Sequence, residues 1–440
     1  MRLLLVTQHF APHFEGGTET VVRAAALALQ AAGHEVAVLA GRDIAGLDEA
    51  ALARGEGREE RDARGNGGLR VIHVPPRIAD SSQPLNDRLM LERPALLEAL
   101  VAEVRAFAPD LVHVHHFATL SLGLVPALAA ANLPVVVSLH DLFSTCPRFF
   151  RVSPFEAACP PPGSLEGCPA CIEGEAVGVP RPVLEEAFRE RRYRFARELD
   201  AADLLLAPSQ SHARRLEAEL QREPGSISVV ESGLVAPLPR LAPPPPLGPG
   251  EPLVLVYFGH RARVKGLAEL AAAVVETARR SPRGLRLTCL GSGLEPELDA
   301  ALVATFEAAR AMGLDVALDL RSSYERSDLP QLVVGAHVAA FPSRAPESYG
   351  LVVDEALALG LPVLCAASGA LAERLPPGAG RALPAPAPGG AADPRWVEEL
   401  SALCEQPARL EEWRTAIPDR IPGPDVLARR LAEHYAPLVT

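Results

Sequence analysis

The feature that most constrains the fold is a series of short apolar runs that alternate with segments of helical periodicity. The first runs lie at 3–6 and 35–40, and between them residues 20–32 have helical periodicity and end at Gly33. Short, continuously apolar runs are typical of parallel strands covered on both faces. Strands that alternate with helices predict a doubly wound α/β sheet.

The alternation occurs twice, on either side of a proline-rich stretch. Residues 236–251 include four consecutive prolines, 243–246, and we expect a semi-rigid linker that joins neither core. A ligand cleft is expected between two such domains, at the carboxyl ends of their strands. Further strands are expected at 69–74, 111–114, 135–139, 204–206 and 227–230 before the linker, and at 253–258, 285–290, 316–320, 338–341 and 362–365 after it.

Composition excludes several classes of protein. The 440 residues include 43 basic and 55 acidic ones, a net charge of −12, and 48% are hydrophobic. That is enough apolar material for full cores, but no basic face is expected for nucleic acid. No run reaches the roughly 18–20 apolar residues of a membrane-spanning helix, and the apolar start is too short for a signal peptide. We expect a cytoplasmic protein.

The chain contains a single lysine, Lys265, because all other basic residues are arginines. Arginine and lysine are nearly equivalent on a solvated surface, but not at a site that needs a compact ammonium group. Lys265 lies in a segment, 257–266, that follows an expected strand and combines glycines with basic side chains. Such a loop suits a diphosphate, so Lys265 is a candidate phosphate ligand.

The strongest local pattern is a pair of glutamates, Glu347 and Glu355, around a glycine. Gly350 lets the backbone approach a ligand closely, and a helix is expected over 351–358. The free amides and dipole of its first turn suit a phosphate, and Glu355 could reach a hydroxyl pair beside it. Surface glutamates on an ordinary helix are the alternative, but the strand–glycine–helix context favours a binding site.

Two weaker patterns follow strands of the first domain. Gly16 and Gly17 either aim amides at a phosphate or form an ordinary turn, and the absence of a complete Gly-x-Gly-x-x-Gly pattern argues against an NAD enzyme. His113, His115 and His116 are interpreted as structural or cleft-lining histidines, because no nearby carboxylate completes a metal site.

Together these patterns resemble the retaining glycosyltransferases of family 4, whose GT-B fold has two Rossmann-like domains facing a central cleft. The resemblance implies transfer of a sugar from a UDP- or GDP-linked donor to a hydroxyl of a glycan, lipid-linked or small-molecule acceptor. The expected domains are 1–235, which binds the acceptor, and 252–418, which binds the donor, with a final helix in 419–440 that packs back on the first. The segments that carry the resemblance are residues 16–19, 139–141, 207–209, 258–266, 290–293 and 347–363.

The resemblance also assigns roles to individual residues. Glu355 would bind the donor ribose, Glu347 the donor sugar, and Lys265 the diphosphate, while no cofactor is required for catalysis. The family usually has arginine where His260 stands, so Arg261 or Arg263 is expected to replace it. The complete set of candidate site residues is Gly16, Gly17, His140, Arg261, Lys265, Glu347, Ser348, Tyr349, Gly350, Leu351 and Glu355, with His140, Lys265 and Glu347 nearest the reacting carbon.

Four cysteines, Cys146, Cys159, Cys168 and Cys171, fall in one loop rich in proline and glycine. The Cys-x2-Cys pair has a spacing used by structural zinc, and a similar set occurs in some members of the family. Two interpretations stay open: a zinc that staples a loop on the acceptor side, or reduced thiols.

Two further alternatives concern the whole protein. A catalytically silent, sugar-nucleotide-binding partner subunit of the same fold would retain much of the pattern, and His260 favours that alternative. An epimerase or a phosphorylase is the rival among enzymes, but the phosphorylase cofactor needs a lysine and Lys265 is already assigned. The basic segment 189–197 is either a solvated helix face or a peripheral contact with the inner membrane face for a lipid-linked acceptor.

Overall fold

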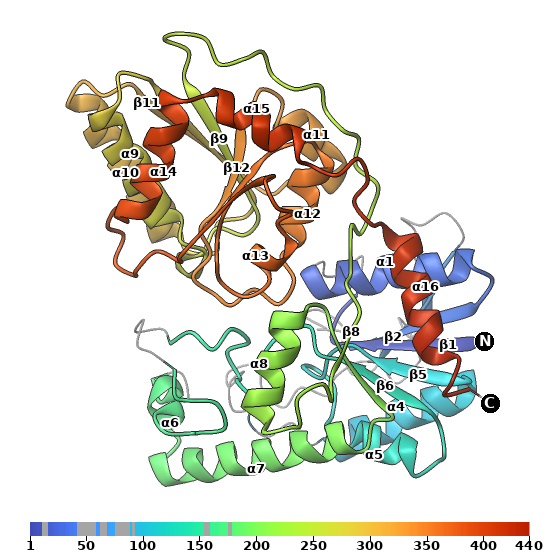
Figure 1. Ribbon diagram of the computed structural model, residues 1–440. Helices are drawn as coiled ribbons and strands as arrows, with labels where there is room; N and C mark the ends of the chain where they lie inside the picture. The colour runs from blue at the N-terminus through green and yellow to red at the C-terminus, as the bar shows by residue number, and fades with distance from the viewer. Residues whose placement is uncertain are drawn as a thin grey trace. The chain divides into compact units, whose positions relative to one another are not determined.

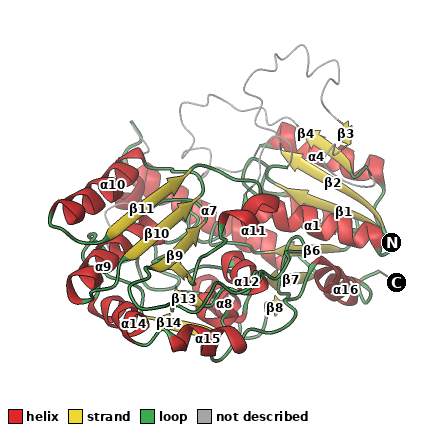
Figure 2. Cartoon of the chain, turned by 90° about the horizontal axis from the view of Figure 1, so that it is seen from above, coloured by secondary structure: helices red, strands yellow, loops and turns green. Residues whose placement is uncertain are grey.

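The computed structural model describes residues 1–10, 16–41, 59–61, 68–74, 89, 93–153, 159–174 and 178–439. The chain divides into two compact units (Figure 1), one formed by Met1–Ala236 with Pro422–Thr440 and the other by Pro237–Ile421. Each unit is built around one sheet with helices on its faces (Figure 2).

The first unit has a sheet in the order β3-β4-β2-β1-β5-β6-β7-β8, in which only β3 is antiparallel to its neighbour. Residues 3–6 of β1 are completely buried, as expected for a strand with helices on both faces. The strands are β1 (Arg2–Thr7), β2 (Glu35–Gly41), β3 (Glu59–Arg61), β4 (Arg70–Val74), β5 (Leu111–Val114), β6 (Val135–Ser138), β7 (Leu204–Ala207) and β8 (Ser228–Val229). The helices are α1 (Gly17–Ala31), α4 (Pro94–Phe107), α5 (Leu124–Ala129), α6 (Cys168–Ile172), α7 (Arg181–Asp200), α8 (Gln210–Leu220) and α16 (Pro424–Tyr435).

The second unit has a parallel sheet in the order β11-β10-β9-β12-β13-β14. The strand order reverses between β9 and β12, and doubly wound sheets bind ligands beyond the carboxyl ends of strands at such a point. The strands are β9 (Leu253–Phe258), β10 (Leu285–Leu290), β11 (Val316–Arg321), β12 (Val338–Phe341), β13 (Val363–Ala366) and β14 (Gly380–Leu383). The helical elements are η1 (Arg263–Lys265), α9 (Leu267–Arg280), α10 (Pro296–Ala311), η2 (Arg326–Asp328), α11 (Leu329–Leu332), α12 (Leu351–Ala358), α13 (Leu371–Arg374), α14 (Pro394–Glu405) and α15 (Ala408–Thr415).

The proline-rich stretch differs from the prediction that it joins neither core. Leu238, Leu241 and Leu247 pack against the core of the second unit. The amide of Leu241 donates to the carbonyl of Leu359 at 3.1 Å. The leucines between the prolines supply apolar contacts that a free linker lacks, so this stretch is part of the second unit.

The C-terminal helix α16 belongs to the first unit. The Tyr435 side chain is fully buried, and its hydroxyl lies 2.6 Å from His113 Nδ1. The amide of Leu234 donates to the carbonyl of Pro422, so the chain re-enters the unit next to the point where it leaves it.

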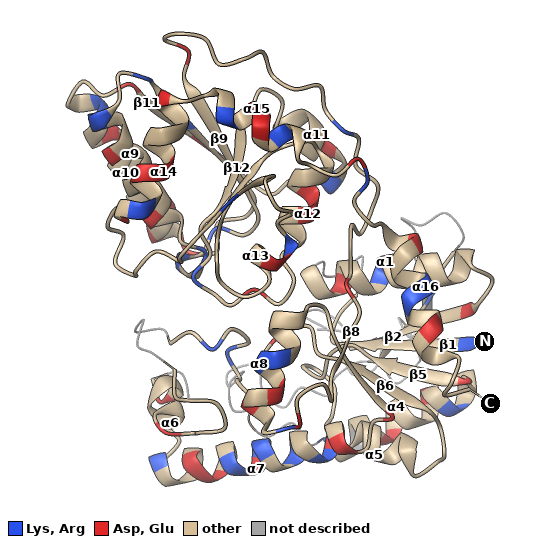
Figure 3. Cartoon of the chain, in the orientation of Figure 1, with Lys and Arg blue, Asp and Glu red and all other residues tan. Residues whose placement is uncertain are grey.

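The basic segment 189–197 lies within α7, which carries charges of both signs along its length (Figure 3). Arg189 pairs with Glu186, and Arg194 pairs with Glu190, at helical spacing. A membrane contact by this helix stays a prediction. Among the described residues, no helix has the length and hydropathy needed to cross a membrane.

Candidate functional site

The strand-order reversal of the second unit brings Lys265 and Glu347 together. Lys265 ends η1 after β9, and Glu347 lies in the loop after β12. Lys265 Nζ is 2.6 Å from Glu347 Oε1, and Ser343 Oγ donates to the same oxygen at 2.6 Å. About a fifth of each charged side chain is exposed, so the pair is held in place yet reachable by a ligand.

A glycine allows these two loops to approach each other. Gly266 has φ +76°, and a Cβ on it would overlap the carbonyl of Pro342. The amides of Arg344 and Ala345 bond back to the carbonyl of Val264. The position of Lys265 beside Glu347 therefore depends on a residue without a side chain at 266.

We expect Gly266→Ala to lower the free energy of unfolding by about 2–4 kcal/mol, since the new methyl group adds overlap to backbone strain. The measurement is urea denaturation of the purified chain. Gly313→Ala is the matched control, because Gly313 has a similar φ of +81° but nothing within 4 Å of its added Cβ. Equal losses in the two variants would contradict the proposed close approach.

Glu355 lies just over one turn inside α12, which begins after Gly350 in the left-handed conformation. Its side chain is buried and forms an ion pair with Arg326 of η2. Burial raises the pKa of Glu355, and the Arg326 guanidinium opposes that shift. Sequence reasoning missed Arg326, because η2 lies 29 residues before Glu355 and carries no glycine-rich signal.

The Tyr349 side chain supports α12. Its hydroxyl donates to Asp354 Oδ2 at 2.6 Å, and the Arg374 guanidinium lies 4.8 Å from its ring centre. Only 5% of Tyr349 is exposed. Tyr349 can therefore offer a ligand its backbone amide, together with those of Gly350 and Leu351, but not its ring.

Arg261 makes structural contacts within the second unit. Its Nε and Nη2 donate to the two carboxylate oxygens of Asp299 at 2.8 and 2.7 Å, and its Nη1 donates to the carbonyls of Gly291 and Arg321. These contacts join the ends of β10 and β11 to α10 and leave the guanidinium buried. These contacts favour a structural role for Arg261, and its phosphate-binding role stays a prediction.

Arg263 is the better placed of the two arginines. Its side chain is 60% exposed and pairs with Glu295 at 2.9 Å. It lies in η1 with Lys265. His260 instead approaches Ser292 Oγ at 2.7 Å, and burial together with the Lys265 charge lowers its pKa, so it adds no positive charge near neutral pH.

Buried histidines surround His140 in the first unit. His140 Nε2 and His115 Nδ1 share a hydrogen bond of 2.9 Å. Burial lowers the pKa of His140 to about 4, although the Asp141 carboxylate opposes the shift. His113, His115 and His116 are buried, which agrees with a structural role, but Asp141 does supply a carboxylate 3.2 Å from His116 Nε2.

Because these histidines are buried, we expect the free energy of unfolding to fall in mild acid. The pKa values of His113, His115, His140 and His212 are all lowered by burial, so the unfolded chain binds more protons below about pH 6.5. Between pH 6.5 and 4 the free energy of unfolding should fall by up to about 1.4 kcal/mol per pH unit for each histidine. Denaturant titrations at several pH values measure the slope. His212→Gln should reduce this slope, and an unchanged slope in that variant would contradict the assignment.

The Gly16–Gly17 turn begins α1, where a carboxylate of the helix already accepts a hydrogen bond from a backbone amide. The Gly16 amide donates to Glu19 Oε2 at 3.1 Å, and Gln8 Nε2 donates to Glu19 Oε1 at 3.1 Å. Glu19 is buried, and this burial raises its pKa. A phosphate at Gly16 and Gly17 would have to displace the Glu19 side chain, so their predicted role stays a prediction.

All four loop cysteines are free thiols. Cys159 Sγ donates to the Arg151 carbonyl at 2.6 Å, and burial raises the pKa of Cys168 to about 11. Within the part of the chain that the structure describes, no group of three or more His, Cys, Asp or Glu side chains is arranged to hold a metal ion. The zinc interpretation stays a prediction, which metal analysis of the purified chain would check.

Comparisons with known proteins agree with the predicted family and fold. Residues 15–235 match the model of Glycosyltransferase Family 4, and residues 211–422 match Family 4 Glycosyltransferase in conflict systems. D-inositol 3-phosphate glycosyltransferase 1 of Catenulispora acidiphila is 28% identical over 69% of this chain and 66% of its own length. Glycogen synthase of Mycobacterium tuberculosis is 25% identical over 85% of this chain and 80% of its own length. The chain spans about half to two thirds of the length of the first curated relatives that it matches.

Solved structures with the same fold cover the whole chain. Sucrose-phosphate synthase from Thermosynechococcus elongatus has a TM-score of 0.65 at 17% identity and covers 100% of this chain and 99% of its own. Anabaena HepE in complex with UDP and glucose has a TM-score of 0.58 at 16% identity. The match covers 99% of this chain and 100% of the HepE chain. The predicted GT-B class, with two doubly wound α/β domains, is confirmed.

Proposed function

The chain belongs to glycosyltransferase family 4, and on that premise we propose that it is a retaining glycosyltransferase that uses a UDP- or GDP-linked sugar. The observation that carries the proposal is the contact between Lys265 and Glu347 at the strand-order reversal of the second unit. A cation and a carboxylate side by side suit a ligand that joins a diphosphate to a hydroxyl-rich sugar. The relatives named above are glycosyltransferases, and one neighbour was crystallised with UDP and glucose.

In this proposal the second unit binds the donor. The Lys265 ammonium and the exposed Arg263 guanidinium bind the diphosphate, with amides from the first turn of α12. Glu347 accepts hydrogen bonds from hydroxyls of the donor sugar, and Glu355, paired with Arg326, accepts from the ribose hydroxyls. Glu347 also orients the Lys265 ammonium before the donor arrives.

The chemical step transfers the sugar with its anomeric configuration retained. The bond between the anomeric carbon and the phosphate oxygen breaks, and an acceptor hydroxyl oxygen bonds to the same face of that carbon. The hydroxyl proton passes to the departing phosphate oxygen. Negative charge grows on the diphosphate, and Lys265 and Arg263 stabilise it as it forms. His140, neutral near pH 7, stays the predicted contribution of the first unit.

The test is thermal unfolding of the full chain with UDP, GDP and ADP, followed by incubation with the sugar derivative of the nucleotide that binds. A ligand that binds only the folded chain raises the midpoint by mass action. We expect UDP or GDP to raise it, and Glu355→Ala to remove most of the rise. Arg280→Ala, on the exposed face of α9, is the control. No shift with any nucleotide in folded protein would reject the donor site.

A silent sugar-nucleotide-binding partner subunit is the second candidate. The observation that favours it is His260, which stands where the family resemblance leads us to expect arginine and approaches Ser292 at 2.7 Å. Binding of a nucleotide without release of UDP or GDP from its sugar derivative, over a broad panel of acceptors, would favour this candidate over the enzyme.

A further inference from the structure

His140, the site candidate of the first unit, has a second histidine as its hydrogen-bond partner. His140 follows β6, and its Nε2 lies 2.9 Å from Nδ1 of His115, which follows the neighbouring strand β5. The two rings are stacked, with centres 5.2 Å apart and an angle of 19° between their planes. In this bond one ring nitrogen must donate and the other accept, so the bond links the protonation of the two rings.

The backbone holds both histidines in place. The His115 amide donates to the Val6 carbonyl of β1 at 2.7 Å, and the Leu139 amide donates to the Leu206 carbonyl of β7 at 2.8 Å. The ends of β5 and β6 are therefore attached to the strands beside them. Only 2% of His115 is exposed, so solvent offers its ring no alternative partner.

The other ring nitrogen of His115 decides which atom donates. His115 Nε2 is buried and has no hydrogen-bond partner among the described residues. Burial lowers the pKa of His115 well below its usual value, so the ring is neutral near neutral pH and carries one proton. A proton on Nε2 would be a buried N–H group without an acceptor, and such groups are rarer in proteins than acceptors left without a donor. The proton of His115 therefore lies on Nδ1, which donates to His140 Nε2.

This bond determines the tautomer of His140. Burial lowers the pKa of His140 to about 4, so its ring is also neutral near neutral pH. Because Nε2 of His140 accepts from His115, the single proton of His140 lies on Nδ1. In this state His140 can donate a hydrogen bond from Nδ1, and it cannot take up a proton on Nε2 without losing the bond to His115.

We propose that His115 is a positioning residue that keeps the proton of His140 on Nδ1, so that His140 meets the bound substrate as a hydrogen-bond donor. His115 acts through His140 and touches no substrate itself. The effect on transfer rests on the proposed function, but the place of the proton is a property of the free chain.

His113 supplies a reference of the opposite kind in the same cluster. The Tyr435 hydroxyl is fully buried and lies 2.6 Å from His113 Nδ1, its acceptor among the described residues. Burial raises the pKa of Tyr435, so the hydroxyl keeps its proton and donates it to that nitrogen. His113 then carries its own proton on Nε2, which lies 2.8 Å from Ser138 Oγ.

The test is NMR spectroscopy of the full chain with isotope-labelled histidine near neutral pH. Two-bond nitrogen–proton correlations identify the ring nitrogen that carries the proton, and the loss of signals in single histidine variants assigns them. We expect the proton on Nδ1 in His140 and His115, and on Nε2 in His113. A His140 ring that carries its proton on Nε2, or on both nitrogens, would overturn the proposal. This measurement needs no variant that might misfold and no activity.

Two substitutions of His115 connect the tautomer to the rate. His115→Leu removes the donor, so His140 should populate the state with the proton on Nε2. The kcat for sugar transfer should then fall roughly three- to tenfold, in proportion to the Nδ1-protonated fraction that remains. His115→Asn places an amide N–H near the former Nδ1 and should restore part of both quantities. Nucleotide affinity should be unchanged in both variants, because the second unit holds the nucleotide in the proposed function.

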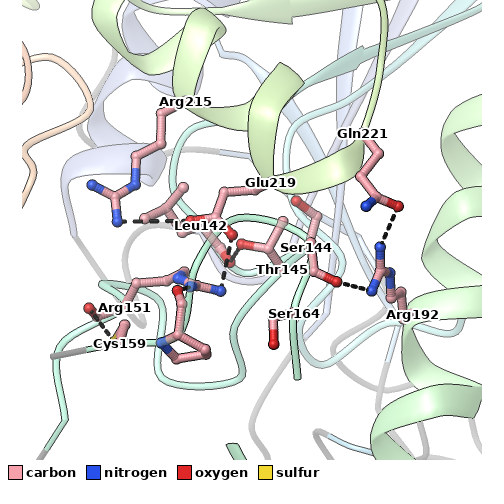
Figure 4. A network of polar contacts seen from close by, with 12 residues as sticks. Leu142, Ser144, Thr145, Arg151, Cys159, Ser164, Arg192, Arg215, Glu219 and Gln221 are labelled. Atoms are coloured by element: carbon pink, nitrogen blue, oxygen red, sulfur yellow. Dashed lines mark hydrogen bonds and ion pairs between the residues drawn. The ribbon is translucent and has the colours of Figure 1, made fainter. Parts of the chain in front are cut away.

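Two controls separate this role from a general loss of stability. His73→Leu removes another buried histidine of the first unit, from β4. Glu219→Gln weakens the buried pair with Arg151, at 2.9 Å, in the polar network of Figure 4, and should lower the unfolding midpoint. Both should leave the tautomer of His140 unchanged.

A folded His115→Leu chain with an unchanged His140 tautomer would overturn the proposal. The nucleotide shift is recorded on the same samples. A chain that binds no nucleotide but carries the His140 proton on Nδ1 would reject the donor site and confirm the place of the proton, so the two failures are distinguishable.

Discussion

Lys265→Ala should lower kcat/KM for sugar transfer by roughly a hundred- to a thousandfold, the effect of removing one preorganised group that stabilises developing charge. The variant loses the cation 2.6 Å from Glu347, and among the described side chains the Ser343 hydroxyl remains as a donor to that carboxylate. An unpaired carboxylate beside the diphosphate would repel it, so donor binding should weaken as well. The measurement is release of the nucleotide diphosphate under initial-rate conditions, with donor affinity determined separately by calorimetry.

Two further variants make this result specific. Lys265→Arg keeps the charge but replaces a compact ammonium with a broad planar group, so we expect an intermediate loss. Arg280→Ala removes a charge from the exposed side of α9, where it pairs with Glu276, and should leave the rate unchanged. If Lys265→Ala retained a rate within threefold of the unsubstituted chain, the charge-stabilising role of Lys265 would be wrong.

Local patterns predicted most of the fold because most of the strands contain a short run of apolar residues. Residues 253–258 and 338–341 were expected as strands and form β9 and β12. β14 was not expected, since its residues, Gly380–Leu383, include a glycine and an arginine and give no apolar run. It forms a strand because its backbone pairs with β13. That pairing depends on the fold of the whole unit, and the residues of the segment alone do not indicate it.

The sequence named candidate residues for the site but none of the contacts between them. Lys265 and Glu347 were both expected at the donor, yet they are 82 residues apart, and their ion pair depends on β9 lying beside β12. Arg326 lies near Glu355 for a similar reason, because η2 follows β11 at the far side of the sheet order. The spacing of residues along the chain does not show which strands lie side by side in the sheet.

Arg261 shows why a charge in a glycine-rich loop is an ambiguous signal. The loop after β9 offers Arg261 and Arg263, and their sequence surroundings do not distinguish them. The difference comes from α10, where Asp299 lies 38 residues further along and accepts two bonds from Arg261. Burial thus assigns Arg261 to the framework and leaves Arg263 exposed at the candidate site.

We expect Arg261→Ala to lower the free energy of unfolding by about 2–3 kcal/mol, the loss typical of hydrogen bonds to a charged group, because the Asp299 side chain left behind is 27% exposed and can be hydrated. The substitution leaves the Asp299 carboxylate and the carbonyls of Gly291 and Arg321 without their donor. For a unit of this size the unfolding midpoint should fall by roughly 10 °C. Urea denaturation and thermal scans of the purified chain measure both quantities.

Arg263→Ala is the matched variant, because it removes the same group from the same loop at an exposed position. Its surface pair with Glu295 contributes at most about 1 kcal/mol, so stability should hardly change, while affinity for the nucleotide diphosphate should fall roughly tenfold. We therefore expect Arg261→Ala to lower stability and Arg263→Ala to lower nucleotide affinity. If Arg261→Ala folded with unchanged stability and lost only nucleotide affinity, Arg261 would be the phosphate ligand after all, and its bonds to Asp299 would have to open when the donor binds.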